Sequence, residues 1–380
     1  MSEQSLLNDV KDYYGKVLKT SDDLKTNACK TACQKMPNHL LKTMKLVHDD
    51  VVAKYYGCGL IIPENVQGCK VLDLGSGSGR DCYILSKLVG ENGQVTGIDM
   101  TEEQIDVARK YIDYHTKTFG FSKPNVEFKK GYIERLREAG IAKNEYDVIV
   151  SNCVVNLSPD KRAVLREAYD SLKVGGEMYF SDVYCDKFLP EHIRKDKVLW
   201  GECLSGALAW TELVQLAEEV GFCKPRLVKA SPITVDNEEM EKIVTGYKFV
   251  SATYRLVKLP LDLQPKCQVI YEGNIEGAEE EFFLDYATSF KAGDVVSVDS
   301  EVATILHCSR YNSDFTLQPC DKGQNGSACC PTTKKHNPDP FALLEGKGYT
   351  DVGCCGPSKK DSGCSPPTSS KAQGCCPAST

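Results

Sequence analysis

The sequence predicts an α/β protein built around a doubly wound, mainly parallel β-sheet. Three observations favour this fold class. Between about residues 60 and 189, short apolar runs alternate with amphipathic segments of helical length, as βαβ units do. Closely spaced glycines follow the first apolar run, and Asp99 ends the second. Doubly wound sheets bind their ligands at such strand ends.

The chain has 380 residues, more than one hydrophobic core usually serves, so several parts are expected. Changes of pattern and composition place their boundaries. We predict an N-terminal helical cap at 1–59, the sheet domain at 60–189, an inserted helical, substrate-binding region with edge strands at 190–260, a small β-rich C-terminal module at 261–320 and a disordered cysteine-rich tail at 321–380.

Apolar periodicity predicts the elements in order. A helical stripe runs from Leu6 to Leu18, and a second helix is expected at 38–56. In the sheet domain we expect strands at 69–74, 95–99, 126–129, 146–151 and 177–184, and helices at 81–89, 102–119 and 159–172. Beyond it we expect helices at 190–200 and 211–220, antiparallel edge strands at 226–229 and 248–257, and short strands at 268–271, 281–286 and 295–298. The tail has seven Pro and eight Gly and too little apolar material for a core.

The composition argues against several functional classes. Hydrophobic residues make up 41% of the chain and charged residues 26%, as in ordinary globular proteins. The net charge is -7 and the basic residues are dispersed, so nothing favours nucleic acid or an anionic membrane as a partner. No apolar run reaches the roughly 18 residues of a membrane span, and the N-terminus lacks a secretory signal. We therefore expect a cytoplasmic protein. We also expect a monomer, although no pattern in the sequence reports the oligomeric state.

Nineteen cysteines are the unusual feature of this composition. In the cytosol they are mostly thiols, available as soft ligands or redox groups. Cys69, Cys82 and Cys223 have apolar neighbours and are best explained as core thiols, whereas the sequence does not decide the role of Cys33 or Cys185. Seven thiols in the tail either collect soft ions or are incidental: Cys329, Cys330, Cys354, Cys355, Cys364, Cys375 and Cys376.

The loop after the first strand is the main candidate for binding a cofactor. Gly75, Gly77 and Gly79 allow a ligand to approach the backbone closely. A dinucleotide fingerprint would need glycine where Arg80 stands. The strand also carries Asp73 just before the glycines. A carboxylate there would repel a pyrophosphate but attract the amino group of a zwitterionic sulfonium ligand.

The end of the second strand adds to this pattern. Asp99 is placed to bind ribose hydroxyls, and Met100 to lie on an adenine face. Together these features resemble the class I methyltransferases, which have a Rossmann-like fold and use S-adenosylmethionine as cofactor. The resemblance implies that the loop including Ser76 holds the cofactor, that residues 131–134, with Ile133 and Glu134, flank adenine, and that Asn152 lies beside the methionine moiety.

Thiols stand where the methyl acceptor of such an enzyme should lie. Cys153 follows the fourth strand of the sheet, Cys203 lies in the inserted helical region, and Cys58 comes just before the sheet. Thiolates from these separate segments could converge on a soft, thiophilic centre.

Four motifs narrow the resemblance further. Tyr-Tyr-Gly-Cys-Gly at 55–59, Asp-Leu-Gly-Ser-Gly-Ser-Gly-Arg-Asp-Cys at 73–82, Ser-Asn-Cys-Val at 151–154 and Trp-Gly-Glu-Cys at 200–203 resemble arsenite methyltransferases over about residues 10–320. The resemblance implies that Cys153 and Cys203 bind trivalent arsenic and that Cys58 is a third ligand and redox partner. It further implies that Cys29 pairs with Cys58 and that Tyr56 helps to close the cofactor pocket.

This family chemistry implies a site without a general base, because trivalent arsenic carries a lone pair. A Cys29–Cys58 dithiol would return the two electrons lost on methylation, and glutathione or thioredoxin would regenerate it. The expected products are mono- and dimethylated arsenicals, and a third methylation stays open. Two alternatives are a methyltransferase for another small molecule, such as a sterol or quinone, and a thiol-rich protein that sequesters soft metals without using the cofactor.

Overall fold

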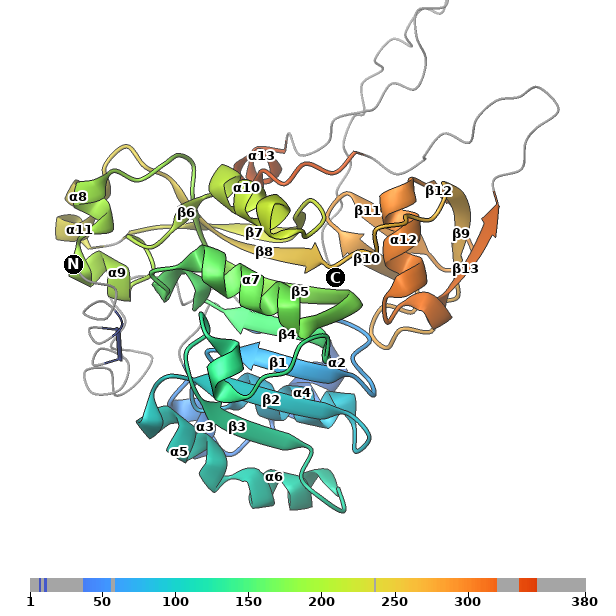
Figure 1. Cartoon of the computed structure of the whole chain (residues 1–380), viewed down its shortest axis with the longest axis horizontal. Coiled ribbons are helices and arrows are strands. Elements are labelled where there is room, and N and C mark those ends of the chain that lie inside the picture. The colour runs from blue at the N-terminus through green and yellow to red at the C-terminus, as the bar shows by residue number, and fades with distance from the viewer. Residues whose placement is uncertain are drawn as a thin grey trace, which may run out of the picture.

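The computed structural model describes residues 7, 10, 11, 37–55, 59–235, 237–319 and 335–346. Its centre is a mixed, mainly parallel sheet with strand order β3-β2-β1-β4-β5-β8-β7, and the short β6 pairs with β5 (Figure 1). The strands of this sheet are β1 (Lys70–Leu74), β2 (Gln94–Asp99), β3 (Val126–Lys130), β4 (Tyr146–Asn152), β5 (Leu172–Cys185), β6 (Leu208–Ala209), β7 (Arg226–Ile233) and β8 (Phe249–Val257).

The strand order explains where a ligand can bind. Strands β1 to β5 run parallel, whereas β8 and β7 complete one edge in antiparallel pairing. The chain moves outward from β1 through β2 to β3 and then returns to β4 on the other side of β1. This reversal opens a crevice beyond the carboxyl ends of β1 and β4. The predicted fold class is confirmed.

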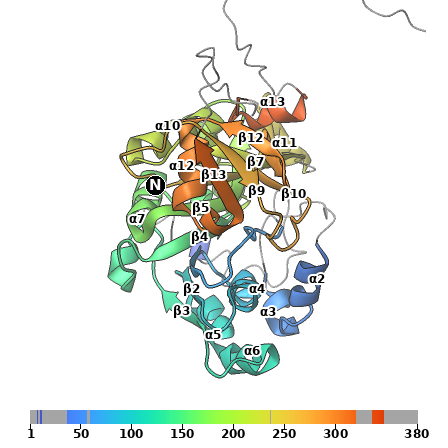
Figure 2. The same ribbon diagram turned by 90° about the vertical axis from the view of Figure 1, so that its right-hand side faces the viewer.

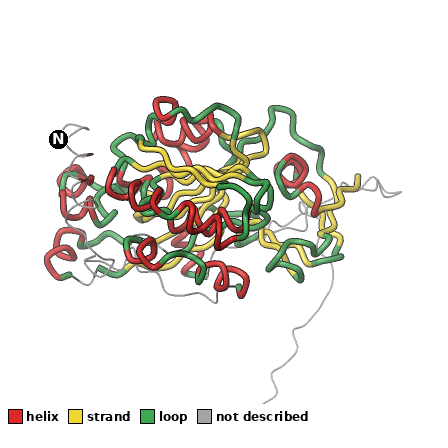
Figure 3. Tube along the Cα trace, turned by 90° about the horizontal axis from the view of Figure 1, so that it is seen from below, coloured by secondary structure: helices red, strands yellow, loops and turns green. Residues whose placement is uncertain are grey.

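Helices cover both faces of the sheet, as Figure 3 shows. On one face Val71 and Val148 pack with residues of α4 and α5. On the other, Leu72 and Ile149 pack with residues of α7 and α10. This alternation along each strand is what a sheet buried on both faces requires. The helices and 3-10 turns up to residue 244 are α2 (Asn38–Met44), α3 (Asp49–Ala53), α4 (Arg80–Val89), α5 (Glu102–Lys110), α6 (Ile112–Phe119), η3 (Leu136–Ala139), η4 (Val155–Leu157), α7 (Lys161–Ser171), α8 (Glu191–Arg194), α9 (Lys197–Gly201), α10 (Trp210–Val220) and α11 (Glu238–Val244).

Three helix predictions are corrected by the structure. The helix expected at 102–119 is two helices, because Tyr111 leaves the helical conformation (φ −105°, ψ 11°) and its ring stacks on His48 at 4.0 Å. The segment expected as one helix at 38–56 contains the two short helices α2 and α3. The region 190–200 is likewise divided into α8 and α9. The expected helix at 6–18 lies almost entirely outside the described residues.

A small C-terminal module lies beside the sheet, and Figure 2 views it from its own side. It has a three-stranded antiparallel sheet, β12-β9-β13, and a two-stranded sheet, β10-β11. A helix that the sequence analysis did not predict, α12, packs on them around a separate apolar core. The elements are β9 (Cys267–Tyr271), β10 (Glu281–Asp285), β11 (Thr288–Lys291), β12 (Val295–Val298), α12 (Ser300–Cys308), η5 (Asn312–Asp314) and β13 (Phe315–Pro319).

Part of the predicted disordered tail is folded against the sheet. Residues 335–346 include α13 (Pro340–Leu344), which contacts β7 and β8. The Tyr254 hydroxyl donates to the Pro338 carbonyl at 2.7 Å, and the Leu227 N–H donates to His336 Nε2 at 2.7 Å. Phe341 packs on the main core. The rest of the tail, with its seven cysteines, lies outside the described residues. Among those described, no helix is long and apolar enough to cross a membrane.

Candidate active site

A cavity lies at the carboxyl ends of β1, β2 and β4, in the crevice made by the strand order. Nine of the eleven residues predicted to bind the cofactor line it: Asp73, Gly75, Ser76, Gly77, Asp99, Met100, Ile133, Glu134 and Asn152. Gly79 does not line it; a side chain there would strike Phe128 at 2.7 Å, so this glycine is required by packing. Tyr56 lies outside the described residues.

The glycine loop brings backbone to the cavity wall. Gly77 has φ +52°, and a Cβ added there would meet nothing within 4 Å, so the space beside it is open to a ligand. A Cβ on Gly75 would instead strike Val154 at 2.4 Å. The Gly77 N–H donates to Asp99 Oδ2 at 2.9 Å, and the Thr101 N–H donates to Asp99 Oδ1 at 2.8 Å. These bonds fix the Asp99 carboxylate at the edge of the loop.

The cavity carries an excess of negative charge. Asp73, Asp81 and Asp99 all line it. Burial raises the pKa of Asp73 to about 7, with the charges of Asp81 and Asp99 acting in the same direction. Burial also raises the pKa of Asp99. The Cys82 thiol donates to Asp73 Oδ2 at 3.1 Å, and burial together with Asp73 raises the thiol pKa, so Cys82 is a buried core thiol as predicted. The site favours a cationic ligand.

The two described cysteines of the predicted thiol site lie next to each other. The Cys203 thiol donates to the Cys153 carbonyl at 3.5 Å, and both residues are buried. Cys153 borders the cavity. Both have left-handed backbones, with φ +58° at Cys153 and +61° at Cys203; the other described non-glycine residues with positive φ are two asparagines. Cysteine adopts this region rarely, and such conformations concentrate at functional sites.

The redox state of Cys153 bears on its predicted role. Cys153 is disulfide-bonded, and none of the other described cysteines is its partner. Cys29 and Cys58, the predicted redox pair, lie outside the described residues. Cys185 is buried near the same site, and burial raises its thiol pKa to about 12, which indicates packing.

Comparisons with known proteins agree with this geometry. A family model described as a methyltransferase domain matches residues 65–221, and one described as an arsenite methyltransferase C-terminal domain matches residues 264–378. The arsenite methyltransferase of Rattus norvegicus is 51% identical over 92% of this chain and 96% of its own length. The enzyme of Homo sapiens is 50% identical over 94% and 99%. The chain belongs to the arsenite methyltransferases.

A solved structure extends the comparison to three dimensions. The crystal structure of an arsenic(III) S-adenosylmethionine methyltransferase from Chlamydomonas reinhardtii matches with a TM-score of 0.72 and 40% identity, covering 75% of this chain and 96% of that one. Like its family, this arsenite methyltransferase is an enzyme that uses S-adenosylmethionine to methylate arsenic.

The cavity of this arsenite methyltransferase fits such a cofactor. Ser76 Oγ and Gln104 Oε1 are buried polar atoms without a hydrogen-bond partner among the described residues, and both residues line the cavity. A polar ligand would satisfy them. With the open space at Gly77 and the three carboxylates, they match a ligand that is polar, zwitterionic and cationic at sulfur.

Sequence reasoning missed several residues of the cavity wall. Gln104 and Thr101 line it one turn apart at the start of α5, and their position directly after Asp99 was the available signal. Asp81 follows Arg80 at the start of α4 and gave no signal of its own. Other missed lining residues are Leu7, Val10, Lys54, Tyr55, Ser78, Val154, Leu157 and Ser158. Glu202, which precedes Cys203 in the motif at 200–203, is only 1% exposed.

Proposed function

We propose that this enzyme holds trivalent arsenic on cysteine thiolates at the edge of the cofactor cavity, with Cys153, Cys203 and Cys58 as ligands. The observation that carries the proposal is the contact between Cys203 and Cys153 at the cavity wall. Two cysteines from separate segments, each in a rare backbone conformation, can form a preformed site for a thiophilic ion once Cys153 is reduced.

The cofactor would be held by the residues that line the cavity. We assign Asp99 to the ribose hydroxyls, Met100 and Ile133 to the adenine faces, and Asp73 to the amino group, since all four line the cavity. Ser76, Gly77, Glu134 and Asn152 complete the predicted set. Bound S-adenosylmethionine supplies an electrophilic methyl group on a sulfonium ion.

The protein's own contribution would be to position arsenic beside the cofactor and to exclude water from it. Trivalent arsenic has a lone pair and carries no proton to remove, so no general base is needed. Cys203 is fully buried and Cys153 is 4% exposed, so arsenic held between them is largely shielded from solvent. Each cysteine thiol that replaces a hydroxide on arsenic forms an As–S bond and releases one water, its proton leaving with the hydroxide, and sulfur ligation raises the electron density on arsenic.

A thiol–disulfide relay would restore the substrate for a second turnover. Methylation takes arsenic formally from the trivalent to the pentavalent state. A Cys29–Cys58 dithiol can return two electrons by forming a disulfide and releasing two protons, and glutathione or thioredoxin would reduce that disulfide. Cys153 itself takes part in a disulfide. It must be reduced before Cys153 can bind arsenic. The products would be mono- and dimethylated arsenicals.

The test is turnover of the full chain with arsenite, a thiol reductant and labelled S-adenosylmethionine. We expect Cys58→Ser, Cys153→Ser and Cys203→Ser to lose more than about a hundredfold in arsenic methylation, beyond the loss typical of residues that merely support a ligand. Cys29→Ser should slow repeated turnover more than the first methyl transfer. Cys308→Ser, a partly buried thiol in the C-terminal module, is the matched control.

Two outcomes would contradict this proposal. Full arsenic methylation by Cys153→Ser and Cys203→Ser would show that these thiols are not ligands. Arsenite binding without methyl transfer, lost when residues 321–380 are removed, would point instead to a protein that sequesters soft metals.

A further inference from the structure

The chain on either side of residues 56–58 is held by one cluster of polar side chains, which we call the Gly59 clamp: Tyr55, Gly59, Arg80, Asp81 and Asn152. The Gly59 carbonyl accepts from Arg80 Nη2 at 3.1 Å and from Asn152 Nδ2 at 2.8 Å. It also accepts from the Tyr55 hydroxyl. Three donors therefore converge on one carbonyl, immediately after the predicted ligand Cys58.

The other flank is held by the same groups. Asn152 Nδ2 donates to the Tyr55 hydroxyl at 2.6 Å and to Asp81 Oδ2 at 3.3 Å. The Arg80 guanidinium lies over the Tyr55 ring, 3.1 Å from its centroid. Thus Tyr55 and Gly59, the two residues that bracket 56–58, are fixed relative to β4 and to the start of α4.

Arg80 ties this cluster to the end of the glycine loop. Its Nε donates to Asp81 Oδ1 at 2.8 Å, and the two side chains form an ion pair with about a tenth of each exposed. A buried guanidinium with three kinds of partner is held in one orientation. This arginine stands where a dinucleotide fold would have glycine, so its side chain has a role that the glycine could not fill.

The clamp also borders the cofactor cavity. Tyr55, Asp81 and Asn152 line the cavity, whereas Arg80 does not. The clamp therefore holds Tyr55 and Gly59, the described residues that flank the predicted ligand Cys58, at the edge of the cavity. Removing Arg80 would loosen Tyr55 and Gly59 without taking away a group that faces the cofactor.

We propose that Arg80 is a positioning residue for arsenic binding, acting through Gly59 and Tyr55, the described residues on either side of the predicted ligand Cys58. This inference rests on the proposed function in that it takes Cys58 as an arsenic ligand. Ordering a ligand segment before the substrate arrives lowers the entropy that binding must overcome. The clamp would therefore act on arsenite affinity more than on cofactor affinity.

The experiment measures kcat and KM for arsenite and for S-adenosylmethionine in Arg80→Gln. We expect the arsenite KM to rise about tenfold, equivalent to about 1.4 kcal/mol, and the cofactor KM to change less than about twofold. Arg80→Lys, which keeps the charge but not the forked geometry, should lie between Arg80→Gln and wild type. Arg109→Gln is the control, because Arg109 also donates to a main-chain carbonyl, that of Phe128, away from the clamp.

A second readout follows the thiol itself. In reduced protein, the rate of Cys58 alkylation by iodoacetamide, followed by peptide mass spectrometry, should increase in Arg80→Gln. Tyr55→Phe should show the same direction with a smaller effect, since it removes the hydroxyl but keeps the ring under Arg80. If Arg80→Gln does not fold, the rate of Cys58 alkylation in Tyr55→Phe tests whether the clamp positions Cys58.

Several results would overturn the inference. Unchanged arsenite KM and unchanged Cys58 alkylation in folded variants would show that the clamp does not position the segment. An equal rise in both KM values would show that Arg80 acts on the cofactor loop instead. Full turnover by Cys58→Ser would refute the proposed ligand role of Cys58, whereas the alkylation rates would still report on the clamp by themselves.

Discussion

Asp73 shows how one residue can link cofactor binding to pH. Its carboxyl group is 4% exposed and shares the cavity with Asp81 and Asp99. Burial raises its pKa to about 7, so without a ligand it is about half protonated at neutral pH. A cationic amino group beside it would favour the charged carboxylate and draw that pKa down. Binding and deprotonation are therefore coupled.

We predict that affinity for S-adenosylmethionine rises with pH between about 6 and 8. The pKa of Asp73 is raised, so its charge is lost as the pH falls through about 7, and each pH unit below that value should weaken binding up to about tenfold. Calorimetric titration at pH 6, 7 and 8 would measure this. Asp73→Asn should bind weakly with little pH dependence, whereas Asp113→Asn, an exposed site, should behave as wild type. Equal wild-type affinity at all three pH values would contradict the prediction.

The sequence could predict the cofactor residues because strand ends fix their place. Asp73 lies near the end of β1, Gly77 follows that strand, and Asp99 ends the neighbouring parallel strand β2; such ends meet at one edge of the sheet. The contact between Cys153 and Cys203 could not be predicted from spacing, since Cys203 comes from an inserted helical region and only the family motif related the two. Their left-handed backbones are also invisible in sequence, because neither residue is glycine or asparagine.

At the scale of elements, alternation of apolar runs located strands well and helix ends less well. The strands β1 to β4 begin and end within a residue of expectation. The break between α5 and α6 was not predictable, because it depends on a ring contact between Tyr111 and His48 from a distant segment. The docking of α13 was missed for a similar reason. Its few apolar residues lie in a Gly- and Pro-rich stretch, and their partners are on β7 and β8.

We predict that residues 335–346 stabilise the fold and that residues 347–380 do not. Removing the former exposes apolar surface under Phe341 and Leu343 and breaks the bonds to Tyr254 and Leu227. A chain ending at residue 334 should lose about 2–4 kcal/mol of unfolding free energy. A chain ending at residue 346 should match the full chain. Urea unfolding of the three proteins would measure this, and equal stability of both truncations would show that the docked helix contributes nothing.

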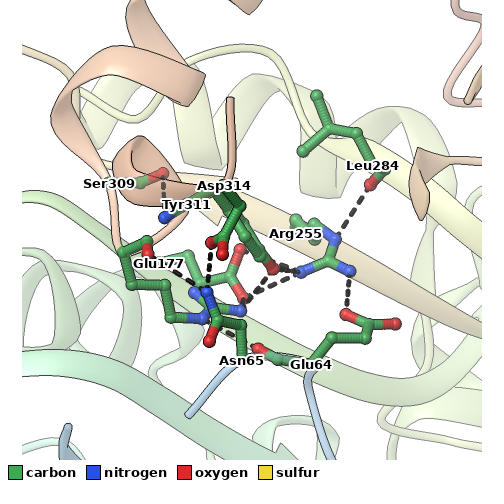
Figure 4. A network of polar contacts seen from close by, with 9 residues as sticks. Glu64, Asn65, Glu177, Arg255, Leu284, Ser309, Tyr311 and Asp314 are labelled. Atoms are coloured by element: carbon green, nitrogen blue, oxygen red, sulfur yellow. Dashed lines mark hydrogen bonds and ion pairs between the residues drawn. The ribbon is translucent and has the colours of Figure 1, made fainter. Parts of the chain in front are cut away.

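At the scale of the whole molecule, a buried network of charges joins the C-terminal module to the sheet (Figure 4). Glu177 on β5 accepts from Arg255 Nη1 of β8 at 2.9 Å and from Arg310 Nη2 of the module at 2.6 Å. The Tyr311 hydroxyl accepts from Arg255 at 2.8 Å. Burial alone would raise the pKa of Glu177, but the two guanidinium groups hold it below its usual range. The sequence changes character near residue 261, where we predict a boundary. In the folded protein, however, buried ion pairs join the parts on either side of that boundary.

We predict that Glu177→Gln lowers the free energy of unfolding far more than the substitution of an exposed charged residue does. The change leaves Arg255 and Arg310 buried without their shared carboxylate, and breaking such a pair costs about 3–5 kcal/mol. Glu191→Gln is the matched control, because its ion pair with Lys195 is exposed and solvent screening leaves such a pair little net effect on stability. Urea unfolding followed by circular dichroism would compare them. A Glu177→Gln protein as stable as Glu191→Gln would mean that the module is held by its apolar contacts, since the guanidinium groups would then tolerate the loss of their common partner.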